Sequence, residues 1–242
     1  MREPRRGGRV GIVGAGRLGS ALAFRLARQA REVVLYDRDP AAARRAAAGG
    51  RVRWVRRPER LLASAGAILL CLPPAEIEPF LARHHDAVGG ATPVCNLATS
   101  LSTAALRRSP GAAGLDLVAL KPVGQFLAIR FGLPTLFVTE PRERRRLAAL
   151  QELVAPLGVV VAGDEEAVGR LNRLATLQAL STCVTFLREG EALGFPAALL
   201  EAALHNVVAG TILDFPPEAG DGYAQELLAG LGRASAAGGG RR

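Results

Sequence analysis

Three glycines near the N-terminus are spaced for the close approach of a ligand to the backbone. Gly14, Gly16 and Gly19 follow the apolar run Val10–Val13 and stand where a helical pattern begins. In such a turn the first glycine permits the bend, the second admits a pyrophosphate, and the third lets the helix pack on the strand. The helix N-terminus then offers N–H groups to the phosphates. We therefore predict a dinucleotide site that includes Gly14, Ala15, Gly16, Arg17, Leu18 and Gly19.

An acidic residue follows the next apolar strand, Val33–Tyr36. This residue, Asp37, is placed to accept hydrogen bonds from the adenosine ribose of NAD and to repel the 2′-phosphate of NADP. Arg38 follows it directly, and Arg44 and Arg45 open the next helical pattern, so a 2′-phosphate would also find partners. The sequence predicts that Asp37 and Arg38 contact NAD or NADP, with NAD slightly favoured.

The chain has a single lysine, Lys121, directly after the apolar run Leu115–Leu120. Arginine cannot release a proton near neutral pH, whereas a partly buried lysine with a lowered pKa can. We therefore predict that Lys121 transfers the proton that accompanies hydride transfer. The alternative is a surface lysine without a chemical role. Thr99 and Ser100, which follow the run Pro93–Leu97, are candidates to bind the substrate, or else a plain turn that caps a helix.

Short apolar runs alternate with helical patterns from the N-terminus to about residue 162. This alternation predicts an α/β domain with a mostly parallel, doubly wound sheet of the Rossmann type. Beyond residue 162 only helical patterns remain, beginning with Asp164 as a helix cap. We expect a dinucleotide-binding domain over residues 1–162 and a small all-α domain over residues 163–242.

The glycine turn, the stretch Leu35–Asp39 and the run Ile68–Pro74 together resemble the 6-phosphogluconate dehydrogenase-like superfamily. Its members include pyrroline-5-carboxylate reductases, prephenate dehydrogenases and β-hydroxyacid dehydrogenases. The resemblance implies a Rossmann domain joined to an all-α domain that often forms a dimer. It also implies that Leu72 and Pro73 lie against the cofactor, and that Pro122, Val123 and Gly124 belong to the substrate loop, with Gly124 in contact with the substrate. Lys121, directly before them, departs from the superfamily's pattern, so its role is inferred from its chemistry alone.

The chain departs from this superfamily on its first long helix after the sheet. The superfamily carries a lysine and an asparagine there; Asn172 is similar to the asparagine, but arginines, Arg170 and Arg173, stand near it in place of the lysine. Arginine binds carboxylates and phosphates well and transfers protons badly. The three residues are therefore expected to bind a substrate with an anionic group, unless the arginines are only a solvated helix face.

Composition excludes several classes of protein. The net charge is +9, and residues 1–60 carry 16 arginines against 5 acids, but no RNA-binding signature or zinc finger accompanies them, so nucleic acid is not the expected ligand. Cys71, Cys95 and Cys183 have no metal-binding spacing, so no metal site is expected. No uninterrupted apolar run reaches the roughly 18 residues of a membrane span. We expect a cytoplasmic protein without a membrane partner.

The helices after residue 163 have more apolar surface than three helices can bury against one another. The first carries a stripe of apolar residues at helical spacing, which predicts a homodimer joined through residues 164–232. His205 or Gln178 of one copy could then reach the other copy's site. Two functions remain open: an NAD(P)-dependent oxidoreductase acting on a small anionic carbonyl or imine compound, or a non-catalytic NAD(P)-binding sensor. A polar pocket would favour the enzyme, and an apolar or closed pocket the sensor.

Overall fold

The computed structural model describes residues 8–29, 31–140, 144–218 and 221–238. Two compact units make up the chain, Met1–Leu174 and Ala175–Arg242. The division falls inside the long helix α8 (Glu165–Ala192), because the first turns of this helix pack on the α/β unit. The change in sequence pattern at residue 162 marks the start of that helix.

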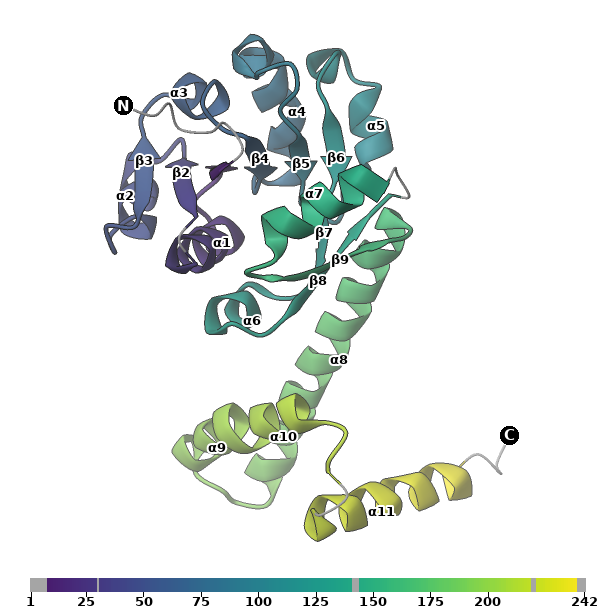
Figure 1. Cartoon of the computed structure of the whole chain (residues 1–242). Coiled ribbons are helices and arrows are strands. Elements are labelled where there is room, and N and C mark those ends of the chain that lie inside the picture. The colour runs from purple at the N-terminus through teal and green to yellow at the C-terminus, as the bar shows by residue number, and fades with distance from the viewer. Residues whose placement is uncertain (1–7, 30, 141–143, 219–220, 239–242) are drawn as a thin grey trace. The chain divides into compact units, whose positions relative to one another are not determined.

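The first unit is built on a six-stranded parallel sheet in the order β3-β2-β1-β4-β5-β6 (Figure 1). This is the strand order of a Rossmann fold, so the predicted fold class is confirmed. The strands are β1 (Arg9–Val13), β2 (Glu32–Tyr36), β3 (Val52–Val55), β4 (Ala67–Leu70), β5 (Val94–Asn96) and β6 (Leu117–Ala119).

Helices cover both faces of this sheet and bury two separate hydrophobic clusters. On one face α1, α6 and α7 pack on alternate strand residues such as Ile12 and Leu35; on the other, α3, α4 and α5 pack on residues such as Val13 and Val34. The elements are α1 (Arg17–Arg28), α2 (Pro40–Ala46), α3 (Pro58–Leu62), α4 (Pro74–His84), η2 (His85–Ala87), α5 (Thr103–Arg107), η3 (Pro110–Ala112), α6 (Phe126–Phe131) and α7 (Arg144–Val154).

A second, three-stranded sheet follows directly after β6. It consists of β7 (Lys121–Val123), β8 (Thr135–Thr139) and β9 (Gly158–Ala162), with β7 antiparallel and β9 parallel to β8. The sequence did not predict strand β7, because Pro122 occupies its centre. Proline is tolerated at the edge of a sheet, and β7 is an edge strand. The chain thus changes sheets between Ala119 and Lys121.

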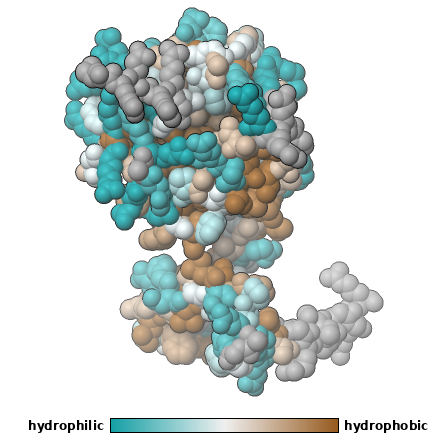
Figure 2. Space-filling model, in the orientation of Figure 1, coloured by the Kyte–Doolittle hydropathy of each residue, from teal (hydrophilic) through white to brown (hydrophobic). Residues whose placement is uncertain are grey.

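The second unit contains the end of α8, then α9 (Ala197–Ala203), a π-helical segment (Leu204–Val208), α10 (Ala209–Asp214) and α11 (Gly222–Gly238). No strand is assigned to its described residues, as expected. Much of its surface is apolar, as Figure 2 shows by its brown colour. The large hydrophobic residues that remain exposed here include Leu177, Leu180, Val184, Leu193, Phe195, Leu199, Val207, Ile212, Leu213, Phe215, Tyr223 and Leu227.

One helical stretch of the described residues, Ala197–Asp214, is long and apolar enough to cross a membrane by length and composition. The sequence reading did not single it out, because Glu201, His205 and Asn206 interrupt the apolar residues. Only 6% of the stretch is buried. Length and composition do not distinguish a spanning helix from one whose apolar side is covered by another protein chain.

Candidate active site

The glycine turn connects β1 to α1 and gives each of its three glycines a different task. Gly14 has a φ of +105°, and a Cβ there would lie 2.5 Å from the carbonyl oxygen of Cys71. A Cβ on Gly19 would collide with the carbonyl of Gly14, so this glycine lets α1 pack tightly on the turn. A Cβ on Gly16 would meet nothing within 4 Å. The backbone at Gly16 is therefore open to a ligand.

Asp37 fixes the shape of this turn. One of its carboxylate oxygens accepts a hydrogen bond from the Ala15 N–H at 2.6 Å, and the other accepts from the Asp39 N–H at 2.8 Å. The acid predicted to bind ribose thus also holds the glycine turn against the end of β2. Each carboxylate oxygen has a second lone pair that remains able to accept from a ribose hydroxyl.

The other predicted cofactor residues surround the turn. Arg17 is exposed and places its guanidinium over the ring of Phe126, 5.0 Å from the centroid. Leu18 is half-buried in the core beneath the turn. Arg38 is 78% exposed and pairs with Glu76 at 3.0 Å. Leu72 and Pro73 follow β4, the neighbour of β1, and so lie at the same edge of the sheet as Gly14.

The chemistry of this edge suits a dinucleotide. No side chain caps the N-terminus of α1 and no acidic residue lies in its first turn, so no acid of the helix itself competes with a pyrophosphate for the N–H groups there. The open approach at Gly16 and the acid at the end of β2 stand where a Rossmann fold holds the pyrophosphate and the ribose.

A pocket of about 480 Å³ lies at the same, carboxyl edge of the sheet, after β5 and β6. It contains four of the predicted substrate residues and the predicted proton-transfer residue. Its walls are Thr99, Ser100, Leu101, Ser102, Lys121, Glu165, Glu166, Gly169, Arg170 and Arg173. Residues from the β5 loop, from β7 and from the first turns of α8 are therefore brought together, and most of them are polar.

Lys121 is the most deeply buried charged residue of this pocket, with 1% of its surface exposed. Its amine donates to the carbonyl oxygens of Ala98 at 2.7 Å and Leu101 at 2.8 Å, and lies 3.3 Å from a carboxylate oxygen of Glu165. Burial lowers the pKa of Lys121 to about 8, although the Glu165 carboxylate opposes the shift. The alternative considered from the sequence was a surface lysine. The structure contradicts it, because Lys121 is buried.

Glu165 lines the pocket, and the sequence did not predict it as a site residue. It is 6% exposed, and its carboxylate accepts from the Thr103 N–H at 2.6 Å and from the Thr103 hydroxyl at 2.7 Å, besides contacting Lys121. Asn96 completes the cluster by donating to the carbonyl of Leu101 and to the Thr103 hydroxyl, both at 3.0 Å. The cluster ties the 97–103 loop to α8 and β7.

The residues of α8 differ in how they are used. Asn172 donates to the carbonyl of Pro122 at 2.9 Å, so it joins the helix to β7. Arg170 is exposed and lies 3.3 Å from Asp164, and Arg173 has no ion pair or hydrogen bond to any described residue. Both residues line the pocket, and the charge of Arg173 is the less compensated of the two. Gly124 is exposed at the end of β7 and is not among the residues of the pocket wall.

The thiols of Cys71 and Cys95 have no place in this chemistry. Burial raises the pKa of each to about 12, so both stay protonated at neutral pH. Within the described residues no group of three or more histidine, cysteine or acidic side chains is arranged to hold a metal ion.

Comparison with known proteins agrees with this geometry. Residues 9–91 match the family described as NADP oxidoreductase coenzyme F420-dependent. This match spans the glycine turn, Asp37, β4 and the residues that follow it. No curated protein sequence matches the chain.

Solved structures with the same fold cover most of the chain at low sequence identity. A pyrroline-5-carboxylate reductase from Coxiella burnetii has a TM-score of 0.69 and 12% identity, over 92% of this chain and 84% of its own. A Plasmodium falciparum pyrroline carboxylate reductase with NADP bound has a TM-score of 0.67 and 14% identity, over 90% and 82%. A Mycobacterium tuberculosis 3-hydroxyisobutyrate dehydrogenase has a TM-score of 0.61 and 20% identity, over 78% of this chain and 67% of its own.

These structures share a fold with the chain, and the family match covers the first part of its parallel sheet, from β1 to α4. Residues 9–91 therefore match the model of the coenzyme F420-dependent NADP oxidoreductase family, and the chain as a whole shares its fold with pyrroline-5-carboxylate reductases and with a 3-hydroxyisobutyrate dehydrogenase.

Proposed function

We propose that this NAD(P)-dependent oxidoreductase acts on a small carbonyl or imine compound that carries an anionic group. The observation that supports this most is the pocket after β5 and β6, whose wall contains Arg170 and Arg173 together with Thr99 and Ser100. A carboxylate on the substrate would pair with the arginines. The hydroxyls of Thr99 and Ser100 would orient the reacting carbon by hydrogen bonds.

When bound at the glycine turn, the nicotinamide dinucleotide supplies or accepts the hydride. Lys121 is the group of the pocket wall with a pKa near neutrality, about 8, and we propose that its ammonium gives a proton to the substrate during reduction. The substrate atom would then replace the carbonyl of Ala98 or Leu101 as an acceptor of the amine. Glu165 acts on Lys121 rather than on the substrate, as a positioning residue.

The polar character of the pocket favours an enzyme over a non-catalytic sensor. A sensor has no need of an ammonium, a carboxylate and two arginines around one cavity, and burying the charges of Lys121 and Glu165 is costly. For the cofactor, Asp37 favours NAD, whereas the matched family is named for NADP and one structural relative has NADP bound. We propose that both dinucleotides bind, with NAD preferred.

The test is oxidation of NADH and NADPH, followed by absorbance, with a panel of 2-oxo acids, cyclic imino acids and their uncharged esters or amides. We expect turnover with anionic members of the panel and loss of turnover with their uncharged partners. Arg173→Gln should raise KM for the anionic substrate by roughly tenfold or more, since a charge-assisted hydrogen bond contributes roughly 1.5–3 kcal/mol. Arg53→Gln, an exposed arginine on β3, is the matched control. Equal turnover of charged and uncharged compounds would refute the anionic substrate.

A further inference from the structure

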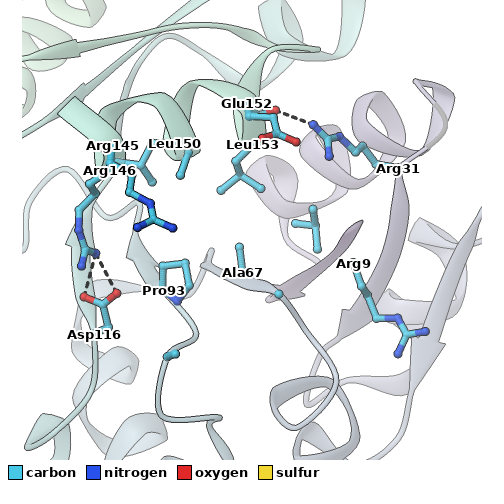
Figure 3. Close-up of a pocket in the computed structure, with 14 residues that line it drawn as sticks. Arg9, Arg31, Ala67, Pro93, Asp116, Arg145, Arg146, Leu150, Glu152 and Leu153 are labelled. Atoms are coloured by element: carbon cyan, nitrogen blue, oxygen red, sulfur yellow. Dashed lines mark hydrogen bonds and ion pairs between the residues drawn. The ribbon is translucent and has the colours of Figure 1, made fainter. Parts of the chain in front are cut away.

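A second cavity lies at the opposite edge of the main sheet from the candidate active site. Its volume is about 560 Å³, and it is formed where strands begin: Arg9 starts β1, Ala67 starts β4, and Pro93 and Asp116 directly precede β5 and β6. Helix α7 closes one side (Figure 3). Because β1 has five residues at about 3.3 Å each, roughly 15 Å of strand separates this cavity from the glycine turn.

The floor of the cavity is apolar. Ala67 from β4 faces Leu150 and Leu153 from α7, and Pro93 lies beside them (Figure 3). Val10 from β1 also lines the cavity. These side chains form a surface against which an apolar body of a ligand can pack, and each square ångström so covered contributes roughly 25 cal/mol.

Four arginines and two acids also line the cavity, and two of the arginines form ion pairs with carboxylates. Arg9 pairs with Glu32 at 2.6 Å, and Arg146 binds both carboxylate oxygens of Asp116 at 2.8 Å. Arg31 donates to the backbone carbonyl of Glu152 at 2.6 Å, a neutral acceptor that leaves its charge uncompensated. The Glu152 side chain, which also lines the cavity, is the one acid whose carboxylate has no ion pair among the described residues.

Arg145 differs from the other three arginines. Its guanidinium makes neither an ion pair nor a hydrogen bond to any described residue, and it extends from α7 into the cavity toward Pro93 (Figure 3). A planar guanidinium offers five donors suited to a carboxylate or phosphate. Here an unused cation stands above an apolar floor, which is the combination that binds an organic anion.

We propose that this cavity is a binding site for a small organic anion, a carboxylate or phosphate monoester on an apolar body, held by Arg145 with Arg31 on the facing side. The site is separate from the redox pocket and does not depend on the proposed reaction. The bidentate pair of Arg146 with Asp116 keeps that arginine in place and leaves Arg145 to meet the ligand.

The experiment is isothermal titration of the full chain with phenyl phosphate, with benzoate, and with benzyl alcohol as the uncharged control. We expect the two anions to bind and the alcohol not to bind. Arg145→Gln should weaken binding roughly tenfold or more, since one charge-assisted hydrogen bond contributes roughly 1.5–3 kcal/mol and 1.4 kcal/mol is tenfold. Arg53→Gln should leave the affinity unchanged.

Arg173→Gln distinguishes this cavity from the redox pocket, which also contains arginines. An affinity that falls with Arg173→Gln and not with Arg145→Gln would assign the anion to the redox pocket and overturn the proposal. Absence of binding by both anions would overturn it as well. Hydrogen exchange gives the location: phenyl phosphate should protect amides of residues 145–153, and protection confined to residues 14–18 would contradict the site. None of these results would change turnover in the redox assay, so a failure of this proposal can be distinguished from a failure of the proposed function.

Discussion

At the scale of single residues, the buried amine of Lys121 carries most of the chemical argument. All three of its N–H donors have an acceptor, two loop carbonyls and the Glu165 carboxylate. The same contacts serve to hold the 97–103 loop in place. Proton transfer and positioning are thus two roles of one group, and they make different predictions.

The first prediction concerns the pH dependence of turnover. With Lys121 as the proton donor and its pKa at about 8, the rate of reduction should be constant below pH 8 and fall as the pH rises through that value, because the ammonium is lost. The rate of the reverse oxidation should rise over the same range. Steady-state kcat measured from pH 6 to 10 checks this.

The variant Lys121→Arg separates the two roles. Arginine keeps the charge and can donate to the same carbonyls, but it does not release a proton, so turnover should fall by roughly 100-fold or more while folding persists. A variant that keeps its rate, or a wild-type profile with no inflection near pH 8, would leave Lys121 with a positioning role only.

The next prediction concerns Asp37 and the choice of dinucleotide. Asp37→Ala removes an acceptor of ribose hydroxyls and also the acceptor of the Ala15 N–H, so both dinucleotides should bind more weakly. The loss should be larger for NADH, because the 2′-phosphate of NADPH gains from removal of a negative charge. Calorimetric titration with each dinucleotide gives the comparison. If NADPH always binds more tightly and the variant changes nothing, the preference for NAD is wrong.

At the scale of elements, Glu165 holds the first turn of α8 to the 97–103 loop by accepting hydrogen bonds from Thr103. Breaking one half of a buried ion pair costs roughly 3–5 kcal/mol, so Glu165→Gln should lower the Tm by several degrees. Glu166→Gln changes a neighbouring exposed side chain and should shift the Tm little. Thermal denaturation of both variants tests this contact, and equal Tm values would show that Glu165 does not hold the helix to the loop. A raised KM in Glu165→Gln would show that the loop it holds serves the substrate.

Most elements could be predicted from the sequence because local patterns determine them. The strands β1 and β2 are apolar runs beside the glycine turn and the acid Asp37, and their predicted bounds, Val10–Val13 and Val33–Tyr36, lie within one residue of the structure. Strand β7 could not be predicted, since a three-residue strand with proline at its centre exists only through its pairing with β8. Helix α6 is short, capped by the Gln125 side chain and ended by Gly132.

Two signals in the sequence pointed to residues of the pocket. One was the single lysine, Lys121, and the other was the resemblance to the superfamily, which drew attention to Arg170 and Arg173 near the place of the missing lysine. Glu165 gave no such signal, because an acid in the first turn of a helix is ordinary. Its contact with Lys121 depends on where the chain changes sheets, and this is a tertiary property that no local pattern encodes.

At the scale of the whole molecule, the exposed apolar surface of the second unit requires a covering. Leu177, Leu180 and Val184 follow one another at helical spacing on α8 and are 52%, 57% and 65% exposed. An exposed stripe of this kind is typical of an interface. We propose that the chain forms a homodimer through residues 164–232, as the sequence suggested, with more than about 2,000 Å² of total buried surface.

Light scattering of the purified chain at micromolar concentration should therefore give twice the mass of 25.3 kDa. Leu180→Glu places a charge in the stripe and should yield monomers, whereas Glu201→Gln, on an exposed position of α9, should leave the dimer intact. A monomeric wild-type chain contradicts the dimer. If it also floats with lipid vesicles in a density gradient, the helix Ala197–Asp214 serves a membrane instead.

The burial of the chain's single lysine has a practical consequence for following its motions. Reagents that acylate amines find no other lysine side chain, and with the amine shielded they react with Lys121 only when the loop over it opens. Once exposed, the amine loses the burial that lowers its pKa, so an alkaline buffer is needed to supply its neutral, nucleophilic form. Mass spectrometry can follow the rate at which an acyl group appears on the peptide that contains Lys121. This rate therefore measures how often the pocket opens, without any engineered label.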